Sequence, residues 1–520
     1  MGWEVFSCQL HMDVIKYQQN DAIKTKGVFC MAWFGWVVVA LVFVLSFFVG
    51  KGLSLKKAAP APKAKPVAVD PQLAAEHLAG ALRCKTYGLV TEDSENIKEF
   101  EKLQAHLRAC FPHVFQTVTT DEVNRCSRLY CWKGDGASQK PPILLMAHQD
   151  VVPIAEGTEQ DWKYPPFDGR IEEGCVWGRG AIDMKNALVA IFEAMEALIK
   201  AGFVPDRDVY ICNGHDEELM LDKGSKGVAA LCKEKGLHFE FVLDEGSSFV
   251  DGEQFGLPGQ LCACIGVYEK GYCDVRVTLH DQAGHSSKPA HPTALSRMAK
   301  IIETVESRPF PVRPTRIFYE MYRDAAPYGG LWGRIKAANP SIFGRGFVNQ
   351  QLKSLQGNAS LRTTVAATQI QASDTPNVLP HTVWANFNCR LNPGDTRQEL
   401  VEFFQEIAGP DCEVTLPTSF EASKIARTNS RAYQAISQAV RQVYGEIPVV
   451  PSVFFASTDS QYFNDLADNV YKHMPFISNL KYTTTMHATN ERIDVESFAH
   501  GIQFYAQLLQ NVCSQTGQAG

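Results

Sequence analysis

The stretch ILLMAHQDVVP, residues 143–153, begins with five apolar residues and continues with His148 and Asp150, two positions apart. A short apolar run is typical of a buried strand, and such strands usually end in turn residues such as Gly, Asn or Pro. Here the strand ends in side chains that can bind a metal. A partly buried His that hydrogen-bonds a neighbouring carboxylate would explain the pair equally well, so the rest of the chain must decide.

Two more apolar runs end in acidic side chains. RDVYICNGHDEEL contains Glu217 and Glu218 after its strand, and FEFVLDEGSS contains Asp244 and Glu245. Helical segments separate the three predicted strands, which indicates an α/β fold with a mainly parallel sheet. Ligands bind such sheets at the carboxyl ends of the strands, so we expect these acids and His148 to meet at one edge. Taken alone, a solvated acidic loop would explain the first of these runs better.

So many carboxylates at one edge would repel one another unless cations compensate their charge. A bound metal, most economically a pair of ions, resolves the repulsion. A dinuclear zinc site uses imidazole and carboxylate ligands, one of which bridges the two ions. Asp183, at the start of a predicted helix, and His487, in TTTMHATNERID near the C-terminus, could complete the set. The alternative for Asp183 is an N-cap, the commonest role of an Asp in that place.

Eight motifs then occur in the order of a known family: MAHQDVVP, WGRGAIDMKNALVA, GHDEE, VLDEG, GHSSKP, DTPNVLP, NCRLNPGD and MHATNERI. From about Gln72 to the C-terminus, the chain resembles the metallopeptidase family of aminoacylase, carboxypeptidase S, succinyl-diaminopimelate desuccinylase and carnosinase. The apolar N-terminal segment, the GHDEE form and the long middle insertion are most similar to carboxypeptidase S and the N-fatty-acyl-amino acid synthase/hydrolase.

The resemblance implies two Zn²⁺ ions per chain. The implied ligands are a bridging acid, two histidines and two further acids: Asp183, His148, His487, Glu218, and either Asp244 or Glu245. His148 and the acid after the third strand would hold one ion, with a slight preference for Asp244 over Glu245. Glu218 and His487 would hold the other ion.

Two more residues have implied roles near the metals. Glu217 would be the general base, which takes a proton from the attacking water and passes it to the leaving nitrogen. Asp150 would orient the imidazole of His148, because residues i and i+2 at a strand end point the same way. Family members also carry a cis peptide after the bridging acid, expected here between Asp183 and Met184.

From about Gly266 the pattern changes to alternating strands and a helix, which predicts an inserted α+β domain that resembles the family's lid. The resemblance implies that His285 polarises the scissile carbonyl. The implied contacts to the substrate carboxylate come from Arg390, Asn377, Thr458 and Asp459. Two glycines of the family are replaced by Ala456 and Ser457, which puts the backbone contacts there in doubt. The aromatic stretch at residues 309–347 is interpreted either as packing of an enlarged lid or as a channel for an acyl chain.

Composition excludes some classes of protein. The 520 residues carry a net charge of −7 without a Lys/Arg block, so nucleic acid is not an expected partner. The fifteen cysteines include no CxxC pair, which indicates neither a zinc ribbon nor a dense disulfide framework. The expected organisation has six segments: an N-terminal tail (1–27), a transmembrane signal anchor (28–50), a Pro/Ala/Lys-rich stalk (51–70), the N-terminal portion of the catalytic domain (71–265), the lid (266–395) and the C-terminal portion of the catalytic domain (396–520).

The predicted anchor, VFCMAWFGWVVVALVFVLSFFVG, carries no charge. About 20 apolar residues span a bilayer, whereas a signal-peptide core usually has about 7–15, so we expect a single-pass membrane protein. The competing interpretation is a start at Met31 and a long cleaved signal, which would make the protein secreted or lumenal. Three lysines precede the segment and five follow it, a strict count that favours a cytosolic domain. Long domains often translocate regardless of charge, so the sidedness stays open, and we expect an extracellular or lumenal catalytic domain.

The sequence therefore predicts a zinc-dependent amidohydrolase: a mainly parallel α/β catalytic domain split by a lid, with an N-terminal membrane segment. The expected substrates are N-acyl amino acids, fatty-acyl ones in particular, and the same site could condense fatty acid and amino acid in reverse. The alternative is a zinc carboxypeptidase of the carboxypeptidase S type acting on small peptides. A catalytically inactive binding protein on the same fold is disfavoured by the complete ligand set. The resemblance also allows a homodimer formed through the lid.

Overall fold

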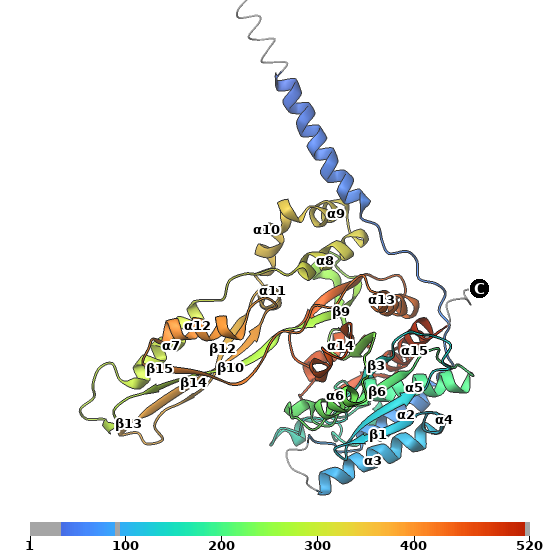
Figure 1. The fold of residues 1–520 in the computed structure, drawn as a ribbon, viewed down its shortest axis with the longest axis horizontal. Coiled ribbons are helices and arrows are strands. Elements are labelled where there is room, and N and C mark those ends of the chain that lie inside the picture. The colour runs from blue at the N-terminus through green and yellow to red at the C-terminus, as the bar shows by residue number, and fades with distance from the viewer. Residues whose placement is uncertain (1–32, 89–93, 515–520) are drawn as a thin grey trace, which may run out of the picture.

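The computed structural model describes residues 33–88 and 94–514. It contains a body built on a large sheet, a second sheet that extends away from the body, and an N-terminal helix that projects from it (Figure 1). The predicted tail, residues 1–27, and residues 28–32 of the predicted anchor lie outside the described residues.

The body is organised around a nine-stranded sheet in the order β1-β2-β6-β3-β7-β17-β9-β16, with β8 paired to β9. The strands are β1 (Thr119–Val123), β2 (Ser127–Trp132), β3 (Ile143–Met146), β6 (Val209–Asn213), β7 (Phe241–Asp244), β8 (Phe249–Asp251), β9 (Leu261–Glu269), β16 (Val449–Phe454) and β17 (Val470–Lys472). Strands β6, β3, β7 and β17 are parallel, and β16 is parallel to β9.

The sheet is mixed, which corrects the expectation of a mainly parallel one. β1 pairs antiparallel with β2, β2 with β6, β8 with β9, and β17 with β9. The β1–β2 connection is a tight turn in which Asn124 and Arg125 have positive φ angles. Antiparallel neighbours need only such a turn, whereas a parallel pair needs a crossover connection. The alternation of strands and helices around the acidic motifs predicted only the central parallel region.

Helices cover both faces of this sheet, which explains why its central strands β3, β6 and β7 are largely apolar. The covering helices are α2 (Pro71–Leu82), α3 (Ser94–Cys110), α4 (Pro112–Thr117), α5 (Lys185–Lys200), α6 (Ser225–Glu234), α13 (Arg431–Tyr444) and α15 (Val495–Val512). In β3, Ile143 and Leu145 join the core formed with α2, α5 and α15, whereas Leu144 and Met146 join the core formed with α6. Successive side chains of a strand point to opposite faces, so this short run fills two cores.

Short elements and a small sheet connect the longer strands and helices of the body. A three-stranded sheet joins β18 (Arg492–Asp494), β5 (Cys175–Trp177) and β4 (Arg170–Glu172) in that order. The remaining short pieces are η1 (Glu159–Asp161), η2 (Glu217–Leu219), η3 (Gly252–Phe255), η5 (Asp459–Phe463), α14 (Ser478–Tyr482) and η6 (Thr483–Thr485). The pairing of β18 with β5 brings the segment that contains His487 next to the segment that contains Asp183.

The second sheet has four strands in the order β12-β14-β10-β15 and a core of its own. Its elements are β10 (Gly271–His280), α7 (Ala294–Ser307), β12 (Thr364–Gln371), β14 (Thr382–Leu391), α12 (Arg397–Ala408) and β15 (Cys412–Phe420). A small pair, β11 (Gly284–His285) with β13 (Val378–Leu379), lies at the end farthest from the body (Figure 1). Because β15 pairs with β10, the sheet continues past the boundary expected at residue 395.

Four helices and a 3-10 turn lie between the second sheet and the N-terminal helix (Figure 1). They are α8 (Arg316–Ala325), η4 (Ala326–Tyr328), α9 (Leu331–Ala338), α10 (Pro340–Gln351) and α11 (Leu355–Leu361). Side chains of α8 and α9 share a core with β9 and β16, not with the second sheet. The aromatic stretch at residues 309–347 therefore packs mainly on the body.

The N-terminal helix, Trp33–Ser54, is long and apolar enough to cross a membrane, judged by length and composition alone. Its C-terminal end is fixed to α9, because the Arg334 guanidinium donates to the carbonyls of Leu53 and Leu55 at 3.1 and 2.7 Å. The following segment has no regular secondary structure, but it lies along the body. The backbone N–H groups of Lys65 and Val67 donate to two glutamine side chains of α15. The predicted stalk is thus bound to the domain it precedes.

Candidate metal centre and active site

The central strands bring three polar loops to one edge of the sheet. β6, β3 and β7 are neighbouring parallel strands, so their carboxyl ends meet. His148 follows β3, Glu217 and Glu218 form η2 after β6, and Glu245 directly follows β7. The structure thereby brings together the acids and the imidazole that the sequence placed at strand ends.

Asp183 lies between the two histidines. Its Oδ1 is 3.0 Å from Nε2 of His148, and its Oδ2 is 3.0 Å from Nε2 of His487. A further acid stands beside each imidazole: Oε1 of Glu245 is 3.6 Å from His148, and Oε2 of Glu218 is 3.1 Å from His487. These residues form two triads that share Asp183, and the ligand atoms of each triad lie within 4.8 Å of one another.

Asp244 and Glu245, which the sequence left as alternatives, point in different directions. The carboxylate of Glu245 joins the triad of His148 and Asp183. Oδ2 of Asp244 instead accepts a hydrogen bond of 3.0 Å from the backbone N–H of Ser460. Adjacent residues at the end of a strand point to opposite faces, so only one of the two can reach His148. The geometry favours Glu245, against the slight preference for Asp244.

Asp150 links both sides of the centre. Its backbone carbonyl is 3.0 Å from Nδ1 of His148, and its carboxylate Oδ1 is 3.4 Å from the same nitrogen. Its Oδ2 accepts from the backbone N–H of Glu218 at 3.1 Å. Hydrogen bonding at Nδ1 leaves Nε2 of His148 directed at Asp183, the orientation that a metal-binding imidazole requires.

The pKa values of the clustered acids reflect a surplus of negative charge at the site. Burial, with the neighbouring acid Glu245, raises the pKa of Glu217 well above its usual value, and burial also raises the pKa of Glu218. Burial and Asp183 do the same for Glu245. Hydrogen bonds from the two imidazoles outweigh burial and lower the pKa of Asp183. Acids that resist ionisation at a shared site are stabilised as carboxylates by a cation.

The donor set fits a pair of divalent ions. Oε1 of Glu218 and Oδ1 of Asp150 are buried without a hydrogen-bond partner. Each triad offers imidazole nitrogen and carboxylate oxygen, the ligands that zinc binds in proteins, and Asp183 has one oxygen for each ion. The residues present therefore suit a dinuclear centre.

Glu217 lies beside the triads but belongs to neither. Its Oε2 is 3.9 Å from Nε2 of His148, and its side chain is largely buried. A carboxylate next to a metal centre that is not itself a ligand can accept and return a proton. The geometry thus distinguishes it from its neighbour Glu218, which contacts His487.

A buried ion pair that the sequence analysis missed positions Asp183. Nη1 of Arg179 donates to Oε2 of Glu491 at 2.6 Å, and both side chains are almost fully buried. The other oxygen of Glu491 accepts from the backbone N–H groups of Ile182 and Asp183 at 2.8 and 3.2 Å. Arg179 and Glu491 both stand inside motifs quoted above, WGRGAID and MHATNERI, which was the available signal.

The Asp183–Met184 peptide is trans, which corrects the expected cis bond. The trans form is favoured for a non-proline peptide by about 3–4 kcal/mol. The hydrogen bonds that the backbone N–H groups of Ile182 and Asp183 donate to Glu491 orient Asp183 in this conformation.

The expected lid residues lie on the second sheet and its terminal strand pair. His285 is exposed on β11, and the backbone N–H of Ser286 donates to the carbonyl of Asn377 at 3.1 Å. Both therefore lie at the far end of the second sheet (Figure 1). Arg390 lies on β14 with its guanidinium over the ring of Tyr272, and burial lowers its pKa. The sequence grouped these three residues, but within one chain Arg390 is separated along the sheet from the other two.

Thr458 and Asp459 are buried, with 2% and 7% of their surface exposed, and their expected contact with substrate stays a prediction. The Thr458 hydroxyl donates to Glu269 at 2.7 Å, and its backbone N–H donates to the same oxygen at 3.1 Å. Burial, with Asp150 and Asp244 nearby, raises the pKa of Asp459 well above its usual value. These contacts hold the segment against the sheet.

Comparison with known proteins agrees with this geometry. Residues 144–511 match the model of Peptidase family M20/M25/M40. The N-fatty-acyl-amino acid synthase/hydrolase PM20D1 of Xenopus tropicalis is 31% identical, with 84% of this chain and 85% of that protein covered. Carboxypeptidase S of Saccharomyces cerevisiae is 29% identical, with 81% and 80% covered.

Solved structures show the same fold at lower sequence identity. The M20 family metallo-carboxypeptidase Sso-CP2 from Sulfolobus solfataricus superposes with a TM-score of 0.59 at 17% identity, covering 84% of this chain and 99% of that one. Human carnosine dipeptidase 1 gives 0.57 at 14% identity, covering 85% and 96%. Together with the family match over most of the chain, the relatives establish that this protein is a metallohydrolase that belongs to Peptidase family M20/M25/M40.

Proposed function

We propose that this protein is a di-zinc amidohydrolase that cleaves N-acyl amino acids, in particular N-fatty-acyl amino acids, and that can join fatty acid and amino acid in reverse. The observation that carries the proposal is the pair of ligand triads that share Asp183, with Glu217 beside them. The names of several relatives, N-fatty-acyl-amino acid synthase/hydrolase at 30–31% identity, support the substrate class.

In this proposal Asp183 would be a ligand of both zinc ions. His148 and Glu245 would complete the ligands of one ion, and Glu218 and His487 would complete those of the other. The ligand distances and the unpartnered Oε1 of Glu218 support the assignment. When bound, the two ions lower the pKa of water and polarise the carbonyl of the scissile amide.

Glu217 then moves the proton. Its carboxylate accepts a proton from the water that attacks the carbonyl carbon, so that a C–O bond forms. It returns that proton to the amide nitrogen as the C–N bond breaks, giving a carboxylic acid and an amine, which become carboxylate and ammonium when the acid's proton passes to the amine. Its position supports this role, because the carboxylate lies beside the site, 3.9 Å from Nε2 of His148, but belongs to neither ligand triad. Asp150 orients His148 through Nδ1.

The second sheet has the role of a lid in this proposal. Arg390, with a planar guanidinium suited to a carboxylate, holds the amino acid end of the substrate together with Asn377 of a second copy of this chain. His285 polarises the carbonyl oxygen. Because His285 and Asn377 lie at the far end of their own sheet, we propose a homodimer through the lid, in which one copy's His285 can reach the other copy's centre. The exposed apolar side chains of Ile370 and Val378 support a contact there.

Thr458 and Asp459 contact the carboxylate of the substrate in this proposal. The hydrogen bonds of Thr458 to Glu269 support the assignment, because they fix the position of this segment. The N-terminal helix anchors the protein to a membrane in this proposal, with the enzymatic domain on the extracellular or lumenal side. Its length and composition support the anchor, and cleavage of the segment would instead release the protein.

A second candidate is a carboxypeptidase that releases the C-terminal residue of small peptides. It is favoured by the relatives named carboxypeptidase S in yeast and carboxypeptidase S-like in Dictyostelium discoideum. The same metal centre serves both reactions, so only the pocket for the acyl moiety distinguishes them.

The deciding experiment compares N-oleoyl-phenylalanine with an N-blocked Gly-Leu dipeptide on the zinc-loaded full chain. We expect a higher kcat/KM for the oleoyl substrate, and formation of N-oleoyl-phenylalanine when oleate and phenylalanine are supplied at high concentration. A preference for the dipeptide by tenfold or more would replace this proposal with the carboxypeptidase.

A further inference from the structure

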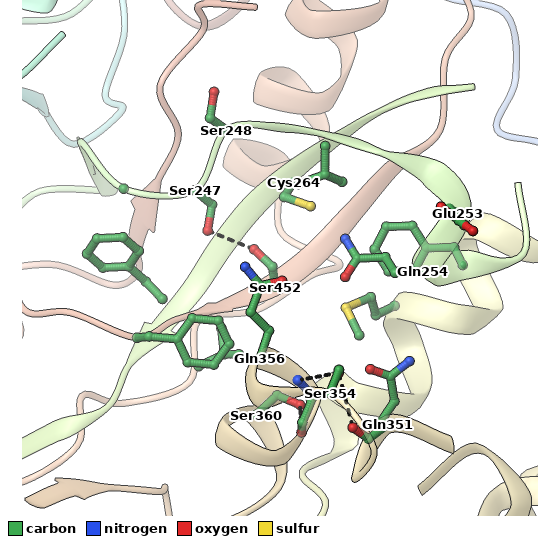
Figure 2. A pocket seen from close by; sticks show the side chains of 18 of the residues that line it. Ser247, Ser248, Glu253, Gln254, Cys264, Gln351, Ser354, Gln356, Ser360 and Ser452 are labelled. Carbon is green, nitrogen blue, oxygen red and sulfur yellow. Dashed lines mark hydrogen bonds between the residues drawn. The ribbon is translucent and has the colours of Figure 1, made fainter. Parts of the chain in front are cut away.

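A cavity of about 560 Å³ lies between the end of β7 and the helices α8, α10 and α11 (Figure 2). Its inner end is formed by Gly246 and Ser247, which directly follow Glu245. The outer end is formed by the end of α10 and the start of α11. The volume is in the range of about 300–1,000 Å³ that is usual for small-molecule sites. One end of the cavity is therefore next to the metal centre.

The inner wall of the cavity consists mainly of apolar side chains. Phe255, Cys264, Met321, Val453 and Phe454 contribute hydrocarbon and sulfur. Serines also line the wall, but their hydroxyl groups are already bonded. The hydroxyls of Ser247 and Ser452 bond each other at 2.8 Å, as Figure 2 shows, and the hydroxyl of Ser248 donates to the carbonyl of Met474 at 2.8 Å. Ser248 and one member of the Ser247–Ser452 pair have thereby used their hydroxyl hydrogens, so the serines leave few free donors for the carbonyl groups of a ligand.

Polar side chains are concentrated at the outer rim. Glu253, Gln254, Gln350 and Gln356 line the cavity and are exposed to solvent. Glu253 is the single charged residue among the lining side chains, and none of the described lining residues is Lys or Arg. A negatively charged group has no cation to meet in this cavity, whereas a neutral apolar chain meets hydrocarbon inside and amides at the rim.

We propose that this cavity binds the acyl chain of the N-acyl amino acid substrate, with the scissile carbonyl at the metal centre and the chain extending from Gly246 toward α10 and α11. The inference rests on the proposed function and goes beyond it by assigning the chain a site. A peptide would bring C=O groups against apolar side chains and against serines whose hydroxyl hydrogens are largely used, and leaving such groups unpaired is costly. The cavity thus selects long acyl chains over peptides.

The test fills the cavity and measures the dependence on chain length. Met321→Trp enlarges a side chain of the wall, and Gln356→Trp does so at the rim. Leu355→Trp is the matched control, because Leu355 is the neighbour of Gln356 on α11, is 92% exposed and does not line the cavity. The substrates are N-acetyl-, N-octanoyl- and N-oleoyl-phenylalanine, and the enzyme is the zinc-loaded full chain.

In the unchanged protein, kcat/KM should rise with chain length, by at most a factor of about four for each buried methylene group. Met321→Trp should lower kcat/KM for the oleoyl substrate at least tenfold and leave the acetyl substrate within twofold. Gln356→Trp should give a smaller loss in the same direction, and Leu355→Trp should change neither. If Met321→Trp lowers kcat/KM equally for all three substrates, the comparison of Gln356→Trp with Leu355→Trp is decisive. Equal kcat/KM values for these two variants would overturn the assignment. An unchanged kcat/KM of Met321→Trp for the oleoyl substrate would also overturn it.

A binding measurement separates this inference from the proposed reaction. A fluorescent anthroyloxy-stearate should bind the full chain, be displaced by oleate, and bind at least tenfold more weakly to Met321→Trp but not to Leu355→Trp. If the protein hydrolyses no N-acyl amino acid yet shows this binding pattern, the proposed reaction fails and the acyl site stands. If it hydrolyses N-oleoyl-phenylalanine but Met321→Trp binds the probe unchanged, the reaction stands and the acyl site fails.

Discussion

Asp183 and His487 are separated by 304 positions in the chain, yet Oδ2 of the acid and Nε2 of the imidazole are 3.0 Å apart. The contact exists because β18 pairs with β5, which carries the C-terminal segment across to the start of α5. His487 itself has a left-handed backbone, with a φ angle of 57°. The metal centre therefore depends on the correct docking of the two ends of the catalytic domain.

The adjacent acids Glu217 and Glu218 should differ when each is changed to Gln. Glu217→Gln keeps the shape and the metals but removes the proton acceptor, so turnover should fall by about 10²–10⁴-fold or more with zinc content unchanged. Glu218→Gln replaces a charged ligand with a neutral one and should lower the zinc content. Zinc analysis and turnover on both variants decide the matter. Loss of zinc from the first variant and retention by the second would exchange the two roles.

Removal of metal should abolish hydrolysis, and zinc binding should release protons. In the metal-free chain, hydrogen bonds to Asp183 and Glu218 raise the pKa of His487 to about 10, so its imidazole is protonated at pH 7. Zinc binds the neutral imidazole, so the proton must leave and the apparent zinc affinity must rise as the pH increases from 6 toward 10. Titration calorimetry in two buffers of different ionisation enthalpy measures the release. Full activity in thoroughly chelated protein would contradict the di-metal assignment.

Glu491→Gln should weaken both the fold and the metal centre. The change leaves Arg179 as a buried cation without its partner, which typically costs about 3–5 kcal/mol, and it weakens the hydrogen bonds that hold Asp183. The control is the double variant Arg179→Met with Glu491→Gln, which removes the unpaired charge. We expect the double variant to recover some of the lost melting temperature but not the zinc affinity. Recovery of both would mean that the pair only stabilises the fold.

Two truncations should separate the N-terminal helix from the segment that follows it. Deletion of residues 1–54 removes the apolar helix and should give soluble, active protein. Deletion of residues 1–66 also removes Leu55, whose side chain packs on the body and whose carbonyl accepts a hydrogen bond from Arg334. It removes the hydrogen bond from Lys65 to α15 as well. The second deletion should lower the free energy of unfolding further, on the order of 2–4 kcal/mol. Equal melting temperatures of the two truncated proteins would show that the segment is only a linker.

The sequence by itself determined the local elements of this protein. The run from Ile143 to Ala147 predicts a buried strand because only apolar side chains can fill the cores on both faces of a covered sheet. The residue types after β3, β6 and β7 predict the metal centre because carboxylates cluster only where cations compensate them. The same patterns identify the N-terminal apolar helix and an inserted second sheet.

Only the tertiary structure decided which groups meet. Glu245 rather than Asp244 faces His148 because Asp244 accepts from Ser460, which lies 216 positions later in the chain. Arg179 and Glu491, the antiparallel strands beside the parallel core, and the cavity between β7, α8, α10 and α11 likewise depend on contacts between distant segments. Periodicity encodes which face of an element is buried but not what buries it. That choice is made when the elements pack around a common core.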